Sequence, residues 1–270
     1  MKKYKKTDAT VVVVDIRNFT LIFETFQKND NRQFLEFIEK YYLIGLELAE
    51  LASTDNNFYL SSSGDGLLII FFGHQHEYCA YLYGLLLFQV LEKTCLDFNE
   101  KNDCQVSFGI GIESGYVQEV SSKVGGREVK TYLGSVINIA SRIESATKNF
   151  GRTKLIIGEH LYHRLIKNLF MEDYNKIVKN NAVFRKNYEE VIQHHNEMNK
   201  LNQNLMLFYI FEHNLKGVST PLRLFRLSPT LADITKVSFF SIVEKLALST
   251  EKLRKVVFFL REKGLPLEYH

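Results

Sequence analysis

The chain of 270 residues is long enough for one large domain, or for one of ordinary size with a small appendage. Hydrophobic residues make up 46% and charged residues 24% of it, with only three prolines, which excludes a fibrous or disordered protein. The formal net charge of +3 is too small to indicate nucleic-acid binding by the whole chain, and the excess of basic residues lies in residues 216–270.

Signals for secretion or membrane insertion are lacking in the sequence. The basic N-terminal residues 1–6 lead into a strand-like segment, not into a signal-peptide core. The longest apolar run, residues 78–91, is shorter than the roughly 20 residues that cross a bilayer, so it predicts a buried helix. Cys79, Cys95 and Cys104 lack metal-ligand spacing and suit a reducing compartment. We therefore expect a cytoplasmic protein without membrane contact.

The first part of the chain predicts a strand, a helix and a hairpin. Residues 11–16 form an apolar run broken by Asp15, a pattern typical of a strand that is buried on both faces. A carboxylate at the end of such a strand needs a partner, which could be a metal. Residues 33–52 follow helical spacing, and residues 56–72 predict two strands joined by a tight turn that contains Asp65.

The next elements complete the predicted core. A long helix is expected over residues 77–99, followed by a strand over 106–113 in which apolar residues alternate with Gly109 and Gly111. This glycine face leaves room for a close approach. Two short strands and a helix over 135–148 follow. The order βαββαβ indicates an α+β sandwich with helices on one face of a mostly antiparallel sheet.

The pattern weakens after a short strand predicted at residues 155–157. Residues 174–203 are polar and rich in Asn, which favours a helical or arm-like segment, and residues 206–211 are apolar enough for a last sheet strand. A boundary near residue 215 then divides the chain into a main domain, 1–214, and a small helical extension, 215–270.

Two apolar-periodic helices are predicted in the extension, over residues 241–249 and 250–263, with a short turn between them. The arrangement resembles a helix-turn-helix, and its basic balance permits DNA contact. Many such pairs only pack against a neighbour, so a role in regulation or dimer support is favoured over nucleic-acid binding.

Three segments together resemble the class III adenylyl and guanylyl cyclase catalytic domain, and the likeness covers about residues 8–165. They are DIRNFT at 15–20, SGDGLLIIF at 63–71 and TYLGSVINIASRIES at 131–145. The resemblance implies a ferredoxin-like sandwich and an enzyme that closes a nucleoside triphosphate into a 3′,5′-cyclic nucleotide with release of pyrophosphate. It makes residues 1–214 the catalytic domain.

Asp15 and Asp65 are the candidate metal ligands. Two carboxylates at strand ends that meet across a hairpin can bridge a pair of divalent ions roughly 3.5–4 Å apart. Hard oxygen ligands suit Mg²⁺ or Mn²⁺. The resemblance adds the backbone carbonyl of Ile16 as a third ligand. The alternative is structural, with Asp15 as a helix cap and Asp65 as a hairpin-turn residue.

The triphosphate site follows the first aspartate. By resemblance, backbone N–H groups of Asn18, Phe19 and Thr20 at a helix start bind phosphate oxygens. The family usually has Gly at the position of Asn18, but Asn also tolerates unusual backbone angles. A family lysine that contacts the triphosphate has no clear equivalent. Arg185 and Lys186 lie in the expected region, where a surface role is favoured for both.

Asn138 and Arg142 lie on one helix face because they are four residues apart. By resemblance, Asn138 orients the ribose and Arg142 stabilises the charge that develops at the α-phosphate, a role that suits a planar guanidinium. In the family these two residues reach into the metal site of the opposite protomer, so the resemblance implies a homodimer with two composite sites. The alternative is an ordinary solvated helix face.

The nucleobase is the open question. Adenylyl cyclases usually have Lys, and guanylyl cyclases Glu, where this chain has Ser61, and Thr131 occupies the second base-reading position. Ser61 is too short to reach a purine edge, and Tyr59 on the same strand face could fill the space that a purine would occupy, although it could equally be a core residue.

The pattern looks like the pyrimidine cyclases of bacterial Pycsar antiphage systems. That resemblance implies cyclic UMP or cyclic CMP made as a signal for a separate effector protein. The hydroxyl groups of Ser61 and Thr131 can both donate and accept, so they do not decide between uracil and cytosine, and UTP is favoured over CTP without them. Three alternatives remain: an adenylate cyclase, a catalytically silent nucleotide sensor, and a DNA-binding regulator.

Overall fold

The computed structural model describes most of the predicted main domain and part of the extension. The described residues are 6–28, 32–124, 127–150, 154–169, 207–213, 215, 221–227, 243–244, 246–247 and 249–265. The segment 174–203, predicted to be helical or arm-like, lies outside them, as do Arg185 and Lys186.

The described strands form one eight-stranded sheet in the order β2-β3-β1-β4-β6-β8-β7, with β5 paired to β4. The strands are β1 (Lys6–Arg17), β2 (Phe58–Ser63), β3 (Gly66–Phe72), β4 (Ser107–Val124), β5 (Arg127–Leu133), β6 (Leu155–Gly158), β7 (Leu207–His213) and β8 (Leu222–Leu227). The pairing of β4 with β6 is parallel, and the other pairings are antiparallel. The prediction of a mostly antiparallel sheet is confirmed.

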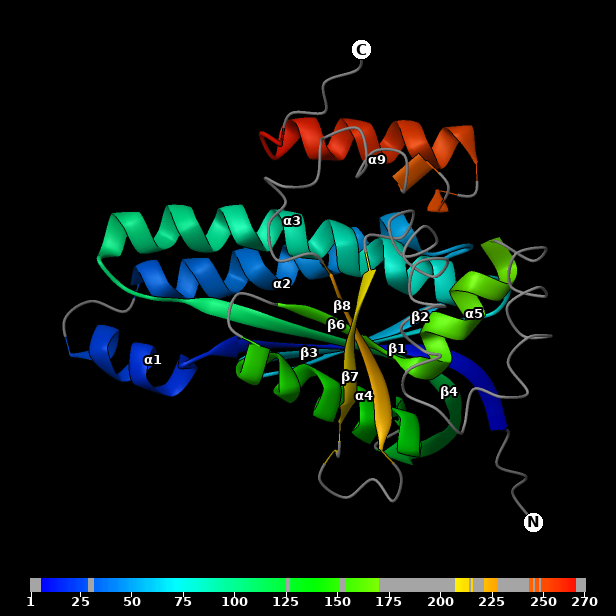
Figure 1. Ribbon diagram of the computed structural model, residues 1–270. Helices are drawn as coiled ribbons and strands as arrows, with labels where there is room; N and C mark the ends of the chain where they lie inside the picture. The colour runs from blue at the N-terminus through cyan, green and yellow to red at the C-terminus, as the bar shows by residue number, and fades with distance from the viewer. Residues whose placement is uncertain are drawn as a thin grey trace.

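Helices cover both faces of this sheet (Figure 1). They are α1 (Phe19–Gln27), α2 (Arg32–Ala52), α3 (His76–Asn102), α4 (Ser135–Ala146), α5 (Glu159–Leu169) and α9 (Thr250–Glu262). Val12 and Val14 of β1 pack in the core with α2 and α3, whereas Val11 packs with Val136 and Ala140 of α4. Because strand side chains alternate between faces, α4 lies opposite α2 and α3. The expectation that all helices lie on one face was wrong.

The two glycines of β4 explain how α4 reaches that second face. A side chain at Gly111 would overlap the backbone of Ala140 and Glu144 in α4, and one at Gly109 would overlap the side chains of Arg17 and Glu144. The close approach expected from the glycine face is therefore confirmed, and the approaching element is α4.

The most apolar helix, α3, forms the centre of the core. By length and composition alone α3 could cross a membrane, but 78% of its most apolar segment is buried inside the domain. The burial of Tyr81, Leu85 and Leu86, each 0% exposed, accounts for that composition by packing. The prediction of a buried helix over residues 78–91 is confirmed.

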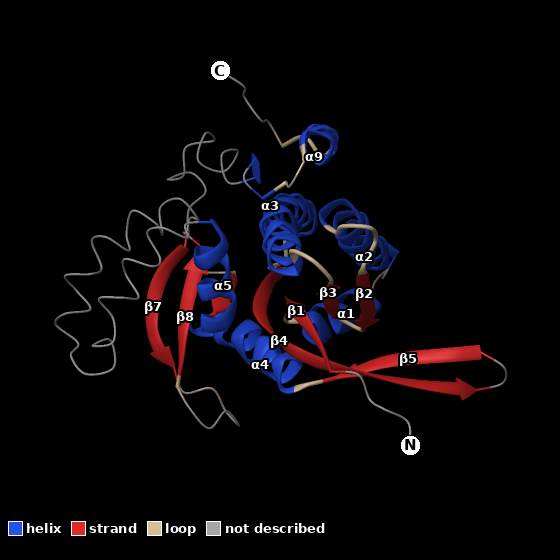
Figure 2. Cartoon of the chain, turned by 90° about the vertical axis from the view of Figure 1, so that its right-hand side faces the viewer, coloured by secondary structure: helices blue, strands red, loops and turns tan. Residues whose placement is uncertain are grey.

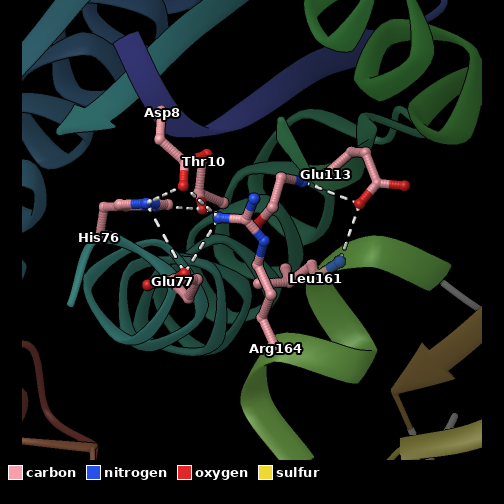
Figure 3. A network of polar contacts seen from close by, with 8 residues as sticks. Asp8, Thr10, His76, Glu77, Glu113, Leu161 and Arg164 are labelled. Carbon is pink, nitrogen blue, oxygen red and sulfur yellow. Dashed lines mark hydrogen bonds and ion pairs between the residues drawn. The ribbon is translucent and has the colours of Figure 1, made fainter. Parts of the chain in front are cut away.

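A partly buried polar network connects α5 to the sheet and to the start of α3 (Figure 3). Arg164 of α5 donates to the carboxylates of Asp8 at 2.9 Å and Glu77 at 3.1 Å. Thr10 lies 2.7 Å from the His76 ring, whose pKa is lowered because the ring is buried. The network joins the start of β1 to α3 and α5, at the end of β1 opposite to Asp15.

The end of the chain returns to the main domain. The strand β8 pairs with both β6 and β7, so the boundary predicted at residue 215 falls inside a hairpin of the sheet. Figure 2 shows α9 lying outside α2 and α3, away from the sheet. Val256 and Leu260 of α9 are buried in the same core as α2 and α3, and Lys252 donates to the carbonyl oxygens of Ala52 and Ser53 at the end of α2. The later of the two predicted tail helices, 250–263, thus packs against the domain.

Candidate active site

Asp15 and Asp65 meet at one end of the sheet. Asp15 pairs with Gly66 in the β1–β3 ladder, and the Ile16 N–H donates to the Asp65 carbonyl oxygen at 3.1 Å. The turn that carries Asp65 requires Gly64, whose φ of +60° is unfavourable for other residues. On α2, the Tyr42 hydroxyl donates to the Gly64 carbonyl oxygen and so supports the same turn. Local pairing thus brings together two acids that are far apart in sequence.

The electrostatics of this acid pair suit a bound cation. Burial raises the pKa of Asp15, and the neighbouring Asp65 carboxylate raises it further, with partial compensation by Arg17 and Lys148. Adjacent carboxylates in a partly buried site repel each other unless a proton or a cation lies between them. The donor set consists of carboxylate and carbonyl oxygens, which are the ligands of Mg²⁺ and Mn²⁺. The residues present therefore fit the expected divalent ions.

The start of α1 forms the next part of the site. Asn18 precedes the helix with φ of 59° and ψ of 21°, a left-handed conformation, and its side chain makes no cap hydrogen bond. Glycine is the residue best suited to that conformation, and Asn is the next most tolerant. Asn18, which stands where the cyclase family usually has glycine, therefore keeps the left-handed backbone conformation. Because the first N–H groups of a helix lack partners within it, those around Phe19 and Thr20 can bind phosphate oxygens.

These parts surround an open pocket of about 630 Å³. Its lining comprises Asp15, Ile16, Arg17, Asn18, Phe19, Thr20, Leu21, Asp65, Ser107, Phe108, Thr147, Lys148 and Lys154. The six predicted metal and phosphate residues are all in this set. Lys148 is an exposed cation at the pocket that the sequence analysis did not single out. A basic residue just after the third motif was its only signal in the sequence.

Arg17, which also lines the pocket, was not singled out in the sequence analysis either. Its guanidinium is 2.6 Å from the Glu144 carboxylate and 3.6 Å from that of Asp15, and it also donates to the Glu144 carbonyl oxygen and the Thr147 hydroxyl. Glu144 is 3% exposed, and this burial raises its pKa to about 7. No local pattern in the sequence indicates this contact, because the partners are 127 residues apart.

Asn138 and Arg142 lie apart from this pocket. Both are exposed on α4, and among the described residues neither lines the pocket that contains Asp15 and Asp65. The predicted site residues of one chain therefore lie in two separate places. Asp15 and Asp65 lie beside the start of α1, whereas Asn138 and Arg142 lie on the outer face of α4.

One of the predicted base-reading residues, Tyr59, belongs to an aromatic cluster. The rings of Tyr59 and Tyr132 lie 4.8 Å apart, and those of Phe72 and Tyr132 lie 5.0 Å apart. Ser61, two residues after Tyr59, points to the same face of β2, while Thr131 and Tyr132 point to opposite faces of β5. No hydrogen bond between Ser61 and Thr131 is found within the described part of the chain. Tyr132, which the sequence analysis did not single out, packs directly against Tyr59.

No protein-family model matches the chain. In an alignment of 155 positions that covers 54% of the chain, it is 28% identical to an adenylate cyclase of Anabaena cylindrica, and this match spans 29% of that longer protein. The chain therefore corresponds to less than a third of its curated relative.

Solved cyclase structures share the fold. The adenylyl cyclase CyaB from P. aeruginosa matches with a TM-score of 0.57 and 17% identity, over 86% of this chain and 100% of that one. The guanylate cyclase domain of RhGC from Catenaria anguillulae, solved with GTP, matches with a TM-score of 0.55 and 16% identity, over 83% of this chain and 98% of that one. The described part of the chain thus has the fold of a class III nucleotidyl cyclase catalytic domain, as predicted.

Proposed function

We propose that the protein is a metal-dependent nucleotidyl cyclase that converts a nucleoside triphosphate into its 3′,5′-cyclic nucleotide and pyrophosphate. The observation that carries the proposal is the pairing of Asp15 with Asp65 beside the start of α1, in one pocket. The sequence similarity to the adenylate cyclase of Anabaena cylindrica supports the same class of reaction.

The residues of the pocket divide the work of the reaction. Asp15, Asp65 and the carbonyl oxygen of Ile16 hold two divalent cations, Mn²⁺ or Mg²⁺. When bound, these cations lower the pKa of the ribose 3′-hydroxyl and offset charge on the departing pyrophosphate. Backbone N–H groups of residues 18–20 bind the triphosphate, and Lys148 at the rim adds a positive charge toward it.

The outer face of α4 supplies the remaining groups to the partner's pocket in a homodimer. Asn138 orients the ribose, and the guanidinium of Arg142 stabilises the charge on the α-phosphate in the transition state. The exposure of both residues, away from the acid pair of their own chain, supports this composite arrangement.

For the base, we propose a pyrimidine, with UTP favoured over CTP. Ser61 provides no long side chain to reach a purine edge, and the contact of Tyr59 with Tyr132 places aromatic bulk on the Ser61 face of β2. The product would be a cytoplasmic signal for a separate effector in antiphage defence. ATP is the second candidate, because the curated relative is an adenylate cyclase.

The decisive experiment supplies the full chain with Mn²⁺ and each of the four ribonucleoside triphosphates, and identifies products by mass. A cyclic pyrimidine nucleotide as the main product is expected, with none from an Asp65→Ala control. Robust cyclic AMP without turnover of UTP or CTP would overturn the pyrimidine assignment alone. The absence of any cyclic product would overturn the cyclase proposal and favour a silent nucleotide sensor.

A further inference from the structure

Arg17 contacts both the metal-binding end of β1 and the helix α4. Its side chain is only 11% exposed, which is unusual for arginine. One guanidinium nitrogen is 3.6 Å from the Asp15 carboxylate, and the other is 2.6 Å from the Glu144 carboxylate. The absence of a side chain at Gly109 makes room for this crossing. Arg17 therefore has two carboxyl partners on two different elements.

The contact with α4 is at the C-terminal end of that helix. The second guanidinium nitrogen also donates to the Glu144 backbone carbonyl oxygen at 3.1 Å, and α4 has no basic residue in its own last turn. Cations stabilise the C-terminal end of a helix because unpaired carbonyl groups gather there. Arg17 supplies that cation from β1, so the position of α4 depends on the strand that carries Asp15.

The two partners compete for one positive charge. With no cation in the site, Asp15 and Glu144 share Arg17. A divalent ion bound to Asp15 repels the guanidinium and satisfies the Asp15 carboxylate, which leaves Arg17 to Glu144 and to the end of α4. This step rests on the proposed function, in which Asp15 binds metal and α4 serves the partner's pocket.

We propose that Arg17 is a positioning residue that couples metal binding in one protomer to the placement of Asn138 and Arg142 in the other protomer's pocket. Metal loading at Asp15 strengthens the contact of Arg17 with α4 of the same chain. In each chain, Arg17 connects the end of β1, which serves one composite site, to the end of α4, which serves the other. The two sites of a dimer are linked in this way.

Mixed dimers test the link directly. One chain carries D65A and the other R142A, so the single working site combines the metal ligands of the R142A chain with α4 of the D65A chain. R17Q is then added to one chain or to the other. In the D65A chain it acts on α4 of the working site, and we expect turnover to fall about 10- to 100-fold. An unchanged turnover in that arrangement would overturn the proposal.

Binding of Mn²⁺, measured by the paramagnetic signal of the free ion, provides a readout that does not depend on activity. R17Q removes a positive charge near the ligands, so Mn²⁺ should bind about three to ten times more tightly although turnover falls. R17K keeps the charge but cannot contact both partners, so Mn²⁺ affinity should stay near that of wild type while turnover remains low. The opposite changes in affinity and turnover distinguish positioning from loss of folding.

Two results would contradict this view of Arg17. If R17Q weakens Mn²⁺ binding and turnover together, in proportion to a lower melting temperature, Arg17 only maintains the fold. If D65A and R142A chains form mixed dimers without regaining activity, the composite site of the proposed function fails, and the Mn²⁺ measurement then decides the role of Arg17 alone.

Discussion

The backbone N–H of Ile16 donates a hydrogen bond to the carbonyl oxygen of Asp65, with 3.1 Å between nitrogen and oxygen. This bond joins the end of β1 to the β2–β3 turn and sets Asp15 beside Asp65. The raised pKa of Asp15 follows from the same arrangement, because burial and the second carboxylate both disfavour its charge.

The acid pair should make the metal-free protein less stable as pH rises. A raised carboxyl pKa means that the folded state holds a proton over a pH range in which the unfolded state has lost it, so stability falls as pH rises through that range. Asp15→Asn removes this effect. We expect D15N to melt at a higher temperature than wild type at pH 8 in chelator, and to have lost Mn²⁺ binding and activity.

The control is Asp97→Asn, an exposed carboxylate on α3. D97N should melt and turn over like wild type at every pH. If D15N is less stable than wild type at pH 8 in chelator, the carboxylate is stabilising in the folded protein and the predicted sign is wrong.

A second pH dependence is expected from Glu144. Burial raises its pKa to about 7 from the ordinary value of 4.5, so it weakens folding progressively as pH rises from about 4.5 to 7. Glu144→Gln cannot ionise. The melting temperature of E144Q relative to wild type should therefore increase as pH is raised from 5 to 8. Parallel melting profiles for the two proteins over this range would contradict the prediction.

Much of the fold could be predicted because its signals are local. The apolar run at 11–16 lies inside β1, and the glycine turn before Asp65 forms as expected. Local sequence does not indicate which face of the sheet α4 covers. Helical periodicity shows that one face of a helix is buried, but it does not show which element that face packs against. The mostly apolar residues 222–227 form β8, which the predicted boundary at residue 215 left outside the sheet.

The candidate site was predictable to the same extent. Residues 15–20 are contiguous, and Asp65 lies in the turn between two predicted strands, so the motifs that resemble the cyclase family indicated both parts of the pocket. The contact of Arg17 with Glu144 depends on how α4 packs on β4, which local sequence does not encode. Lys148 enters the pocket through the turn after α4, and its position depends on that same packing.

Lys148 should bind the triphosphate. It is exposed at the pocket and close enough to Asp15 to lower that group's pKa. Lys148→Ala should raise KM for the metal–nucleotide complex about tenfold with a smaller change in kcat, because a charge on the outer phosphates acts mainly on binding. Steady-state kinetics at low ionic strength would measure this change.

Lys101→Ala, at the end of α3, is the matched control and should leave KM unchanged. High salt should reduce the difference between K148A and wild type, since exposed charges are screened. If K148A lowers kcat while KM stays constant, Lys148 acts in the chemical step and not in binding.

Ser61 offers a direct test of base selection. Replacing it with lysine restores the long donor that adenylyl cyclases usually have at this position, so S61K should raise the ratio of ATP to UTP turnover at least about tenfold. Ser62 is its neighbour on the opposite face of β2, so S62K adds the same charge pointing away. Competition assays with both nucleotides would measure the ratio, and equal shifts in S61K and S62K would show that charge alone, not position, is responsible.

The packing of α9 predicts that the tail contributes to stability. The Lys252 ammonium donates to the carbonyl oxygens of Ala52 at 2.8 Å and Ser53 at 2.7 Å, where the last carbonyl groups of α2 lack partners within the helix. Hydrogen bonds from a charged donor to such groups contribute about 1–3 kcal/mol. Lys252→Met should therefore lower the free energy of unfolding by about that amount in urea titrations.

Lys255 lies on the exposed side of the same helix, where it pairs with Glu251 at i, i+4. Exposed pairs of this kind contribute little, so Lys255→Met should leave the unfolding free energy nearly unchanged. Both variants remove one positive charge from α9. If K255M destabilises the protein as much as K252M, the net charge of the tail matters more for stability than the contact of Lys252 with α2, and the prediction is wrong.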